Sequence, residues 1–311
     1  MVKKADVIWF DGKLVDWDEC NVHILAHTLH YGLGVFEGIR SYVRTDGRSA
    51  IFRLREHMER FCKGAAMMTM PLDYTPDQLV DAAIETCQRN RLRSCYLRPI
   101  AFLGTGGMGV GSMDNTVHVA IATWPWGAYL GDEALSQGVR VKVSTFVRPH
   151  QNSQLHKGKV CGHYVNSILA KREAIREGYH EALMLDTQGF VCEATGENIF
   201  AVVNGEIYTA PYGAAILGGI TRNTVMHIAE ENGYKVREER FTRDVLYLAD
   251  EVFMVGTAAE VTPVREIDGR VIGTGKPGPV TKDIQAKYFD IVKGQDSQHD
   301  QWLTYYDVED H

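Results

Sequence analysis

The sequence predicts a protein of two domains, the first of which has an α+β fold. Two strands flank an Asp11-Gly12 turn, two helices follow, and two strong strands end this part of the chain. The stretch from Pro125 to Gly138 is typical of a connection between domains. At 311 residues, the chain is also longer than one ordinary domain. We therefore expect a small domain at residues 1–125, a linker at 126–137 and a larger domain at 138–311.

The elements of the first domain follow from hydrophobic periodicity. Apolar residues recur at spacings of four and three from Leu54 to Met68, which predicts a helix with one apolar face. Thr75 precedes a second helix, at about 76–89. The expected strands lie on both sides of the turn within 6–16, and at 40–43, 50–52, 95–102 and 116–123.

The second domain mixes helices and strands. Helices are expected at 164–177 and 221–232, because Gly178 and Gly233 follow them as C-caps. Strands are expected at 140–147, 181–186, 190–192, 198–203, 206–209 and 251–255. The polar tail, 295–311, is expected to be a lightly packed extension.

Composition and charge are those of an ordinary globular protein. The chain is 45% hydrophobic and 23% charged. Its formal net charge of -7 argues against nucleic acid or an anionic membrane as the main partner. No run is long enough for a membrane helix, and Asp6 interrupts any apolar segment that could serve as a signal peptide. We therefore expect a cytoplasmic protein.

Cysteines and histidines do not predict a metal site. The six cysteines are scattered without a CxxC pair, so we expect reduced thiols rather than a zinc site or a disulfide framework. His23, His27 and His30 lie close together, but no carboxylate or thiol accompanies them in a ligand pattern. We interpret these histidines as structural or as pocket lining.

A glycine-rich segment matches the pattern of a dinucleotide-binding motif. Gly104 to Gly109 satisfy GxGxxG after a strand, but that motif requires a helix next. Here a turn at 112–115 leads into another strand. The segment is therefore interpreted as a flexible loop over a pocket.

Three features suit amine chemistry on a carbonyl cofactor, which needs a lysine, an acid and a phosphate cradle. Residues 217–222 place a glycine pair before a helix, so that free N–H groups and the Thr221 hydroxyl form an anion site. A plain helix N-cap is the alternative. The turn at 256–259 could add amides, or could simply end a strand.

The acid and the lysine are less certain from the residues alone. Glu193 ends a strand and could face a pyridine nitrogen, although a solvated hairpin carboxylate is the alternative. Composition does not choose between Lys157 and Lys159 as the reactive lysine.

Resemblance to a known family resolves these alternatives. The segment from Lys159 to Tyr164 resembles the Lys-x-x-Gly-Asn-Tyr signature of the branched-chain aminotransferases, and only Lys159 stands five residues before the tyrosine. The closest likeness is to the bacterial biosynthetic enzymes. Further matching motifs follow in the family's order, at 8–12, 30–32, 36–40, 56–60, 96–99, 124–129, 196–200, 219–222 and 256–260.

The resemblance implies a fold and a reaction. The fold is fold type IV, shared with D-amino-acid aminotransferase, with a small α+β domain, a larger α/β domain built as a barrel-like sheet, and the cofactor between them. The reaction is the reversible transfer of the amino group of L-leucine, L-isoleucine or L-valine to 2-oxoglutarate, giving the branched 2-oxo acid and L-glutamate. The cofactor is pyridoxal 5′-phosphate, bound as a Schiff base to Lys159. A homo-oligomer, either a dimer or a trimer of dimers, is also implied.

The resemblance assigns roles to single residues. Lys159 is the catalytic lysine, Tyr164 binds the 3′-oxygen of the cofactor, and Glu193 binds its pyridine nitrogen. The other cofactor-binding residues are Arg60, Leu217, Gly219, Ile220, Thr221 and Thr257. The substrate residues are a polar group of Tyr31, Arg98 and Tyr129, an apolar wall of Phe36, Met108 and Trp126, and the amides of Thr257 and Ala258.

The chain departs from the family pattern in two places. Cys161 replaces a usual small residue and His163 the usual asparagine, which could change the packing beside the lysine. Residues 105–107 differ from the commoner acidic loop, and this difference concerns the breadth of substrate choice.

Other proteins of this fold give the alternative functions. A D-amino-acid aminotransferase shares the scaffold and the lysine, and an aminodeoxychorismate lyase releases pyruvate without an amino acceptor. The Phe36-Glu37-Gly38 motif and the pairing of Tyr96 with Arg98 favour the branched-chain type. A cofactor-binding protein without catalysis would need neither Arg98 nor the substrate amides.

Overall fold

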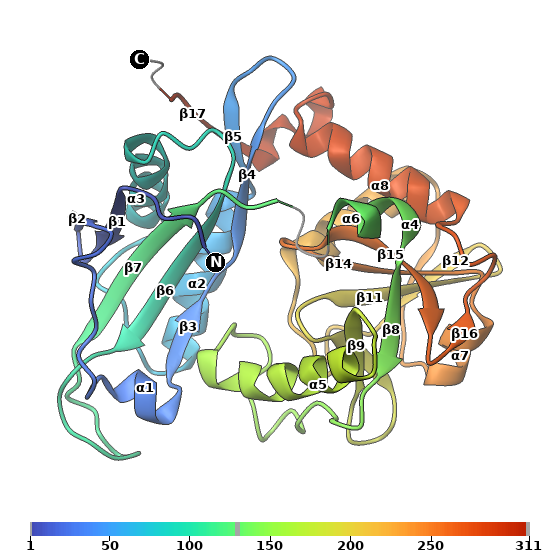
Figure 1. Ribbon diagram of the computed structural model, residues 1–311, viewed down its shortest axis with the longest axis horizontal. Coiled ribbons are helices and arrows are strands. Elements are labelled where there is room, and N and C mark those ends of the chain that lie inside the picture. The colour runs from blue at the N-terminus through green and yellow to red at the C-terminus, as the bar shows by residue number, and fades with distance from the viewer. Residues whose placement is uncertain (1, 128–130, 309–311) are drawn as a thin grey trace. The chain divides into compact units, whose positions relative to one another are not determined.

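The computed structural model describes residues 2–127 and 131–308, and these form two compact units (Figure 1). The first unit comprises Met1–Trp126, Gly158–His163 and Asp290–His311, and the second comprises Gly127–Lys157 and Tyr164–Phe289. This division differs from the expected boundaries, because 158–163 and the C-terminal segment belong to the first unit. The physical reason is strand pairing: Val160 forms a bridge with Val35, and the C-terminal strand joins the first sheet.

The first unit is built on an eight-stranded antiparallel sheet. Its strand order is β17-β5-β4-β6-β7-β1-β2, with β3 beside β6. The strands are β1 (Val7–Phe10), β2 (Lys13–Asp16), β3 (Gly34–Phe36), β4 (Ile39–Val43), β5 (Ser49–Phe52), β6 (Cys95–Leu103), β7 (Val117–Trp124) and β17 (Leu303–Tyr306). The Asp11-Gly12 turn joins β1 to β2, with both residues at positive φ, as the sequence predicted.

Two long helices pack against this sheet (Figure 1). They are α2 (Leu54–Met67) and α3 (Pro76–Arg89), and both occupy the predicted ranges. Thr75 and Gln78 form a capping box at the start of α3, and the predicted apolar face of α2 is buried. The short helices of this unit are α1 (His27–Tyr31), η1 (Cys161–His163) and η2 (Ser297–Trp302).

The expectation of a lightly packed tail was wrong. β17 pairs along its length with β5, and the buried Tyr306 hydroxyl lies 2.7 Å from Ser41 Oγ. A polar stretch with three aromatic residues carries little periodicity of its own. Its strand is therefore decided by a partner about 250 residues away.

The second unit is a barrel-like sheet of nine strands, as the family fold implied. The order is β10-β9-β8-β15-β14-β11-β12-β13, and an extra β10–β11 pairing closes the strands from β10 to β11 into a ring. The strands are β8 (Val139–Val143), β9 (Glu181–Leu185), β10 (Val191–Ala194), β11 (Asn198–Val203), β12 (Glu206–Thr209), β13 (Val236–Glu238), β14 (Glu251–Gly256), β15 (Glu260–Ile267) and β16 (Arg270–Val271).

The two helices predicted in the second unit begin and end close to the expected positions, whereas the other helices of this unit were not predicted. Gly178 and Gly233 follow α5 and α6 at positive φ, as C-caps require. The helices are α4 (Asp132–Gln137), α5 (Tyr164–Arg176), α6 (Ile220–Glu231), α7 (Arg243–Leu248) and α8 (Pro279–Val292), the last of which ends within the first unit. Among the described residues, no helix is long and apolar enough to cross a membrane.

Two local differences from the expected elements have clear causes. β8 ends at Val143 rather than Val147, because Ser144 and Thr145 turn to bind the Glu173 carboxylate. β15 was not predicted, and it contains Pro263 in the interior of the sheet. Proline usually argues against such a strand because it has no N–H to donate.

Candidate active site

The two candidate lysines have different surroundings. The Lys157 amine donates to the carbonyls of Ala214 at 3.1 Å and Ile216 at 2.9 Å, and lies 4.4 Å from the Tyr212 ring centre. Burial is the main cause of a lowered pKa at this amine. Lys157 therefore holds the segment that leads to α6, which is a structural task.

Lys159 lies beside β3 of the first unit. Its carbonyl accepts the N–H of Phe36 at 3.0 Å, and its amine lies 5.2 Å from the centre of the Phe36 ring. Gly158 precedes Lys159 and packs against α2, since a Cβ there would lie 2.5 Å from the end of the Met67 side chain. The half-buried Cys161 thiol follows in η1, and burial raises its pKa.

Arg60 is fixed by an acid that sequence reasoning did not assign. Its Nε and Nη2 donate to the two oxygens of Glu37 at 2.7 and 2.9 Å, and His57 Nδ1 lies 2.8 Å from the second oxygen. Only 16% of the Arg60 side chain is exposed, although Arg60 lies off the apolar face of α2. The FEG motif at 36–38 was visible in the sequence, but its pairing with Arg60 was not.

The charges of this cluster balance one another. Burial alone would raise the pKa of Glu37, but Arg60 and His57 outweigh it and hold that pKa well below its ordinary value. Burial lowers the pKa of His57, so that the imidazole is neutral and Arg60 is the cation of the pair. Arg60 thus has its orientation set by a bidentate ion pair.

Arg98 lies among aromatic rings instead of acids. Its guanidinium carbon is 4.8 Å from the Phe36 ring centre, 5.3 Å from that of Tyr96 and 5.9 Å from that of Trp124. Nη2 donates to the Tyr96 hydroxyl at 3.3 Å, and the buried Nε has no hydrogen-bond partner among the described residues. Trp126 packs on Tyr96, with ring centres 4.3 Å apart.

The other predicted substrate residues of the first unit that the structure describes have exposed side chains. Tyr31 is exposed at the end of α1, and Met108 is exposed on the glycine-rich loop. That loop continues into β7, and His27 Nε2 lies 2.9 Å from its Gly109 carbonyl. Tyr129 falls outside the described residues. The structure therefore brings Phe36, Arg98 and Trp126 together around Tyr96, and exposes the side chains of Tyr31 and Met108.

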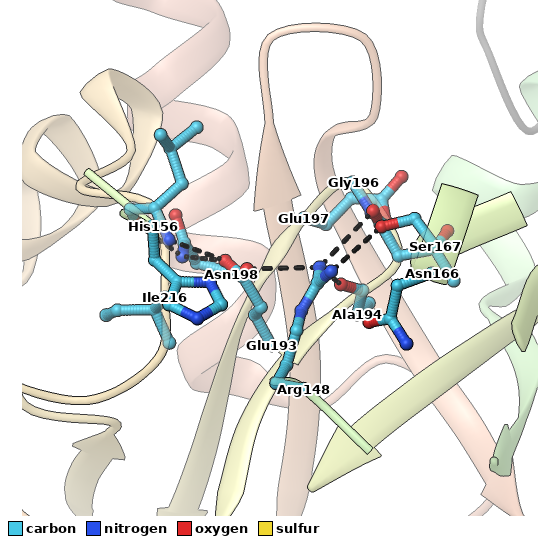
Figure 2. A network of polar contacts seen from close by, with 12 residues as sticks. Arg148, His156, Asn166, Ser167, Glu193, Ala194, Gly196, Glu197, Asn198 and Ile216 are labelled. Carbon is cyan, nitrogen blue, oxygen red and sulfur yellow. Dashed lines mark hydrogen bonds and ion pairs between the residues drawn. The ribbon is translucent and has the colours of Figure 1, made fainter. Parts of the chain in front are cut away.

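In the second unit, Glu193 accepts from several donors, which Figure 2 shows from close by. Arg148 Nη2 lies 3.1 Å from its Oε1, while Asn198 Nδ2 at 3.2 Å and the Leu217 N–H at 3.0 Å donate to Oε2. Glu193 is only 7% exposed, so the alternative of a solvated hairpin carboxylate was wrong. Arg148 was missed because no sequence pattern joins positions 148 and 193.

The glycine pair at 218–219 leads directly into α6. Gly219 is the N-cap with no side-chain cap bond, and the next residues, Ile220 and Thr221, are buried. A Cβ on Gly219 would lie 2.1 Å from Asn198 Oδ1, so glycine is required for this approach. The N-terminus of a twelve-residue helix is suited to an anion, because the backbone N–H groups of its first turn and the helix dipole face that end.

The second small-residue turn leaves β14. Thr257 and Ala258 are half-buried, and the Thr262 hydroxyl closes the turn by donating to the Ala259 carbonyl at 2.7 Å. A Cβ on Gly256 would lie 3.3 Å from the Gly196 carbonyl, beside the end of β10. Tyr164, half-buried, is the first residue of α5. No group of three or more histidine, cysteine, aspartate or glutamate side chains in the described ranges is placed to hold a metal ion.

Comparison with known proteins identifies the family. The family model described as amino-transferase class IV matches residues 34–267, which is most of the chain. The chain therefore belongs to the class IV aminotransferases, and it is a transaminase that depends on pyridoxal 5′-phosphate.

Curated relatives and solved structures narrow the group to the branched-chain-amino-acid aminotransferases. The enzyme of that name from Pseudomonas aeruginosa is 50% identical over 304 residues, covering 98% of both chains. The Escherichia coli K12 enzyme is 45% identical over 302 residues, or 97% of both chains. This group is the one that the sequence motifs indicated, and that prediction is confirmed.

Solved structures of this group have the same fold. The Escherichia coli branched-chain amino acid aminotransferase superposes with a TM-score of 0.95 at 44% identity, over 98% of this chain and all of that one. The T.th. enzyme with pyridoxamine 5′-phosphate gives 0.94 at 47% identity, over 97% and 99%. The expected fold class is therefore confirmed, and the D-amino-acid aminotransferase and lyase alternatives are not favoured.

Proposed function

We propose that the chain transfers the amino group of L-leucine, L-isoleucine or L-valine to 2-oxoglutarate, with Lys159 as the catalytic lysine. The observation that carries this proposal is the aromatic surround of Arg98. Arg98 is a partly buried cation that pairs with none of the described carboxylates, so it suits the carboxylate of a glutamate side chain. The aromatic rings beside it suit a branched alkyl group. One region can therefore accept both kinds of side chain.

The residues present fit pyridoxal phosphate. The N-terminus of α6 and the Arg60 guanidinium, whose orientation is set by Glu37, each suit a phosphate dianion, and the buried Glu193 suits a protonated ring nitrogen. In this proposal the cofactor is bound by Arg60, Lys159, Tyr164, Glu193, Leu217, Gly219, Ile220, Thr221 and Thr257. The commitment of Lys157 to two carbonyls supports Lys159 as the lysine concerned.

Each of these residues then has one task. The bound cofactor supplies a carbonyl carbon for the amino group and a ring that takes up the electron pair of the substrate α-carbon. The Lys159 amine, once the substrate has replaced it, would take the proton from the substrate α-carbon and deliver it to the cofactor carbon that carries the nitrogen. Glu193 keeps the ring nitrogen protonated, and Tyr164 hydrogen-bonds the 3′-oxygen. The amides of Thr257 and Ala258 bind the substrate carboxylate.

The substrate side chain is proposed to meet Phe36, Trp126 and Arg98, with Tyr31, Met108 and Tyr129 as further contacts. Exposed apolar residues support a homo-oligomer in which a neighbouring copy covers Tyr31 and the glycine-rich loop. Val110 is 92% and Met113 is 94% exposed on that loop. We also infer a cytoplasmic location, for which the six unpaired cysteine thiols are suitable.

Half-reactions of the purified holoenzyme test the function. Incubation with L-leucine or L-glutamate should convert the cofactor to its amine form, while D-alanine should leave it unchanged. Absorbance of the bound cofactor reports the conversion, and light scattering reports the mass of the oligomer. Conversion by D-alanine but not by L-leucine would refute the proposed substrate class.

A further inference from the structure

Arg148 follows β8 in the second unit, and its main chain is anchored beside β9. Its N–H donates to the Leu185 carbonyl at 2.7 Å. The side chain is buried with the rest of the residue. A buried arginine is costly unless an anion and hydrogen-bond acceptors receive its donors.

Four acceptors surround the Arg148 guanidinium, and one of them is the Thr195 carbonyl, 3.5 Å from Nη2. Nη1 donates to the Ser167 hydroxyl at 2.9 Å, and Nη2 donates to the Ala194 carbonyl at 3.0 Å. Nη2 also forms the ion pair with Glu193 Oε1. Figure 2 shows the guanidinium between Glu193 and Ser167, so that α5 and the end of β10 both aim it at the carboxylate.

The two carboxylate oxygens of Glu193 have different kinds of partner. Oε1 faces the arginine, whereas Oε2 receives the neutral N–H groups of Asn198 and Leu217. Lys157 and Cys192 are the other titratable groups that respond to this carboxylate. The Lys157 amine is engaged with two carbonyls, and burial together with Glu193 raises the pKa of Cys192 to about 12.

We propose that Arg148 is a positioning residue that keeps the buried Glu193 carboxylate ionised and fixes its orientation toward the cofactor. The inference rests on the proposed role of Glu193 in binding the ring nitrogen. Without the cation, a carboxylate buried to this extent would bind a proton near neutral pH. A protonated Glu193 would no longer hold the ring nitrogen in its charged form.

The test compares Arg148→Gln with Arg148→Lys in the full-length protein. Glutamine is polar but carries no charge, whereas lysine keeps the charge. At pH 6.5 we expect Arg148→Gln to lose at least tenfold in kcat with L-leucine, and to recover by up to about tenfold per pH unit as Glu193 loses its proton. Arg148→Lys should keep the wild-type pH profile.

A second readout does not depend on turnover. The affinity of the apoprotein for pyridoxal 5′-phosphate, followed by absorbance titration, should fall in Arg148→Gln at pH 6.5 and recover at pH 8.5. Arg140→Met is the matched control, because Arg140 is an arginine of β8 that pairs with Glu266 at 2.8 Å, away from Glu193. It should leave both pH profiles unchanged.

The outcomes separate the inference from the function on which it rests. Losses in Arg148→Gln and Arg148→Lys that are equal and independent of pH would overturn the positioning role and indicate a packing role. Glu193→Gln, measured alongside, should lose several orders of magnitude in proton transfer from L-leucine at every pH. A near-normal rate in Glu193→Gln would instead refute the role of Glu193 itself.

Discussion

Arg60 and Arg98 lie in the same unit and show how the partner of an arginine sets what it can bind. Both oxygens of Glu37 receive the Arg60 guanidinium, which fixes its plane and compensates its charge. Arg98 has three aromatic rings around it, one of which is the phenol that accepts its hydrogen bond, and none of the described carboxylates pairs with it. An anionic ligand therefore gains more from Arg98, because its charge is not yet compensated.

Replacing Arg98 should separate the two substrates. Arg98→Met should reduce kcat/KM of the glutamate half-reaction by about 10- to 100-fold, because charge-assisted hydrogen bonds are worth about 1.5–3 kcal/mol. The leucine half-reaction should change much less. Rapid-mixing measurements of both half-reactions check this, with the exposed Arg89→Met on α3 as the control. Equal losses for both substrates would assign Arg98 a structural role.

Mutation should also distinguish the roles of Lys157 and Lys159. Lys159→Ala should lose both turnover and the visible absorbance of the lysine-bound cofactor, since no other amine takes its place. Lys157→Ala should keep both, with weaker cofactor binding, because 211–217 loses two hydrogen bonds. Absorption spectra and L-leucine turnover of the two variants are the measurements. A surviving cofactor band in Lys159→Ala would show that another lysine reacts.

At the scale of elements, α6 and the strand end at Glu193 are tied together by one side chain. Asn198 Nδ2 donates both to Glu193 and to the Leu217 carbonyl, at 3.2 and 3.0 Å. Gly219, the N-cap of α6, leaves room for this amide. The position of the candidate phosphate cradle therefore depends on the same asparagine as the position of the acid.

A side chain at Gly219 should disturb both the candidate phosphate cradle and the position of Glu193. Gly219→Ala places a methyl group 2.1 Å from Asn198 Oδ1, while its φ of -65° makes no demand for glycine. We expect at least tenfold weaker binding of pyridoxal 5′-phosphate, on the order of 1.4 kcal/mol or more. Gly213→Ala in the preceding segment meets no atom within 4 Å and is the control. Titration of the apoproteins checks this, and equal affinities would show that Asn198 can move without cost.

For the whole molecule, the buried Glu37 cluster links stability to pH. The lowered pKa of Glu37 means that its contribution is present above about pH 4.3 and is lost as pH falls further. The lowered pKa of His57 acts in the same direction below about pH 6.5, because the unfolded chain binds a proton more readily. Protonation of either group at low pH therefore destabilises the folded protein.

Removing the charge of Glu37 should show this dependence. Glu37→Gln leaves Arg60 without its anion and should cost about 3–5 kcal/mol at pH 7, with a shallower loss of stability below pH 4. Glu206→Gln is the control, since Glu206 has a pKa lowered to about 2 but lies at the surface, where solvent screens its ion pairs. Denaturant midpoints of the apoproteins from pH 7 to pH 3 test the difference. Parallel curves for wild type and Glu37→Gln would contradict it.

Local signals in the sequence determined several elements and the family. The capping box at Thr75, the apolar face of α2 and the glycine C-caps involve residues within about four positions of one another, so the chain shows them directly. Motifs around Lys159, Glu193 and Gly219 identified the family and the candidate residues in the same way. Side-chain chemistry and short spacing were sufficient for these conclusions.

Only the tertiary structure decided which distant residues meet. The pairing of β17 with β5, of Arg148 with Glu193 and of Glu37 with Arg60 joins positions that no periodic pattern connects. Each pairing depends on how the strands are ordered in a sheet, and that order is settled by the packing of the whole core. The sequence by itself therefore determined the local elements and the family and indicated the candidate reacting groups, whereas the fold decided which charge each group faces.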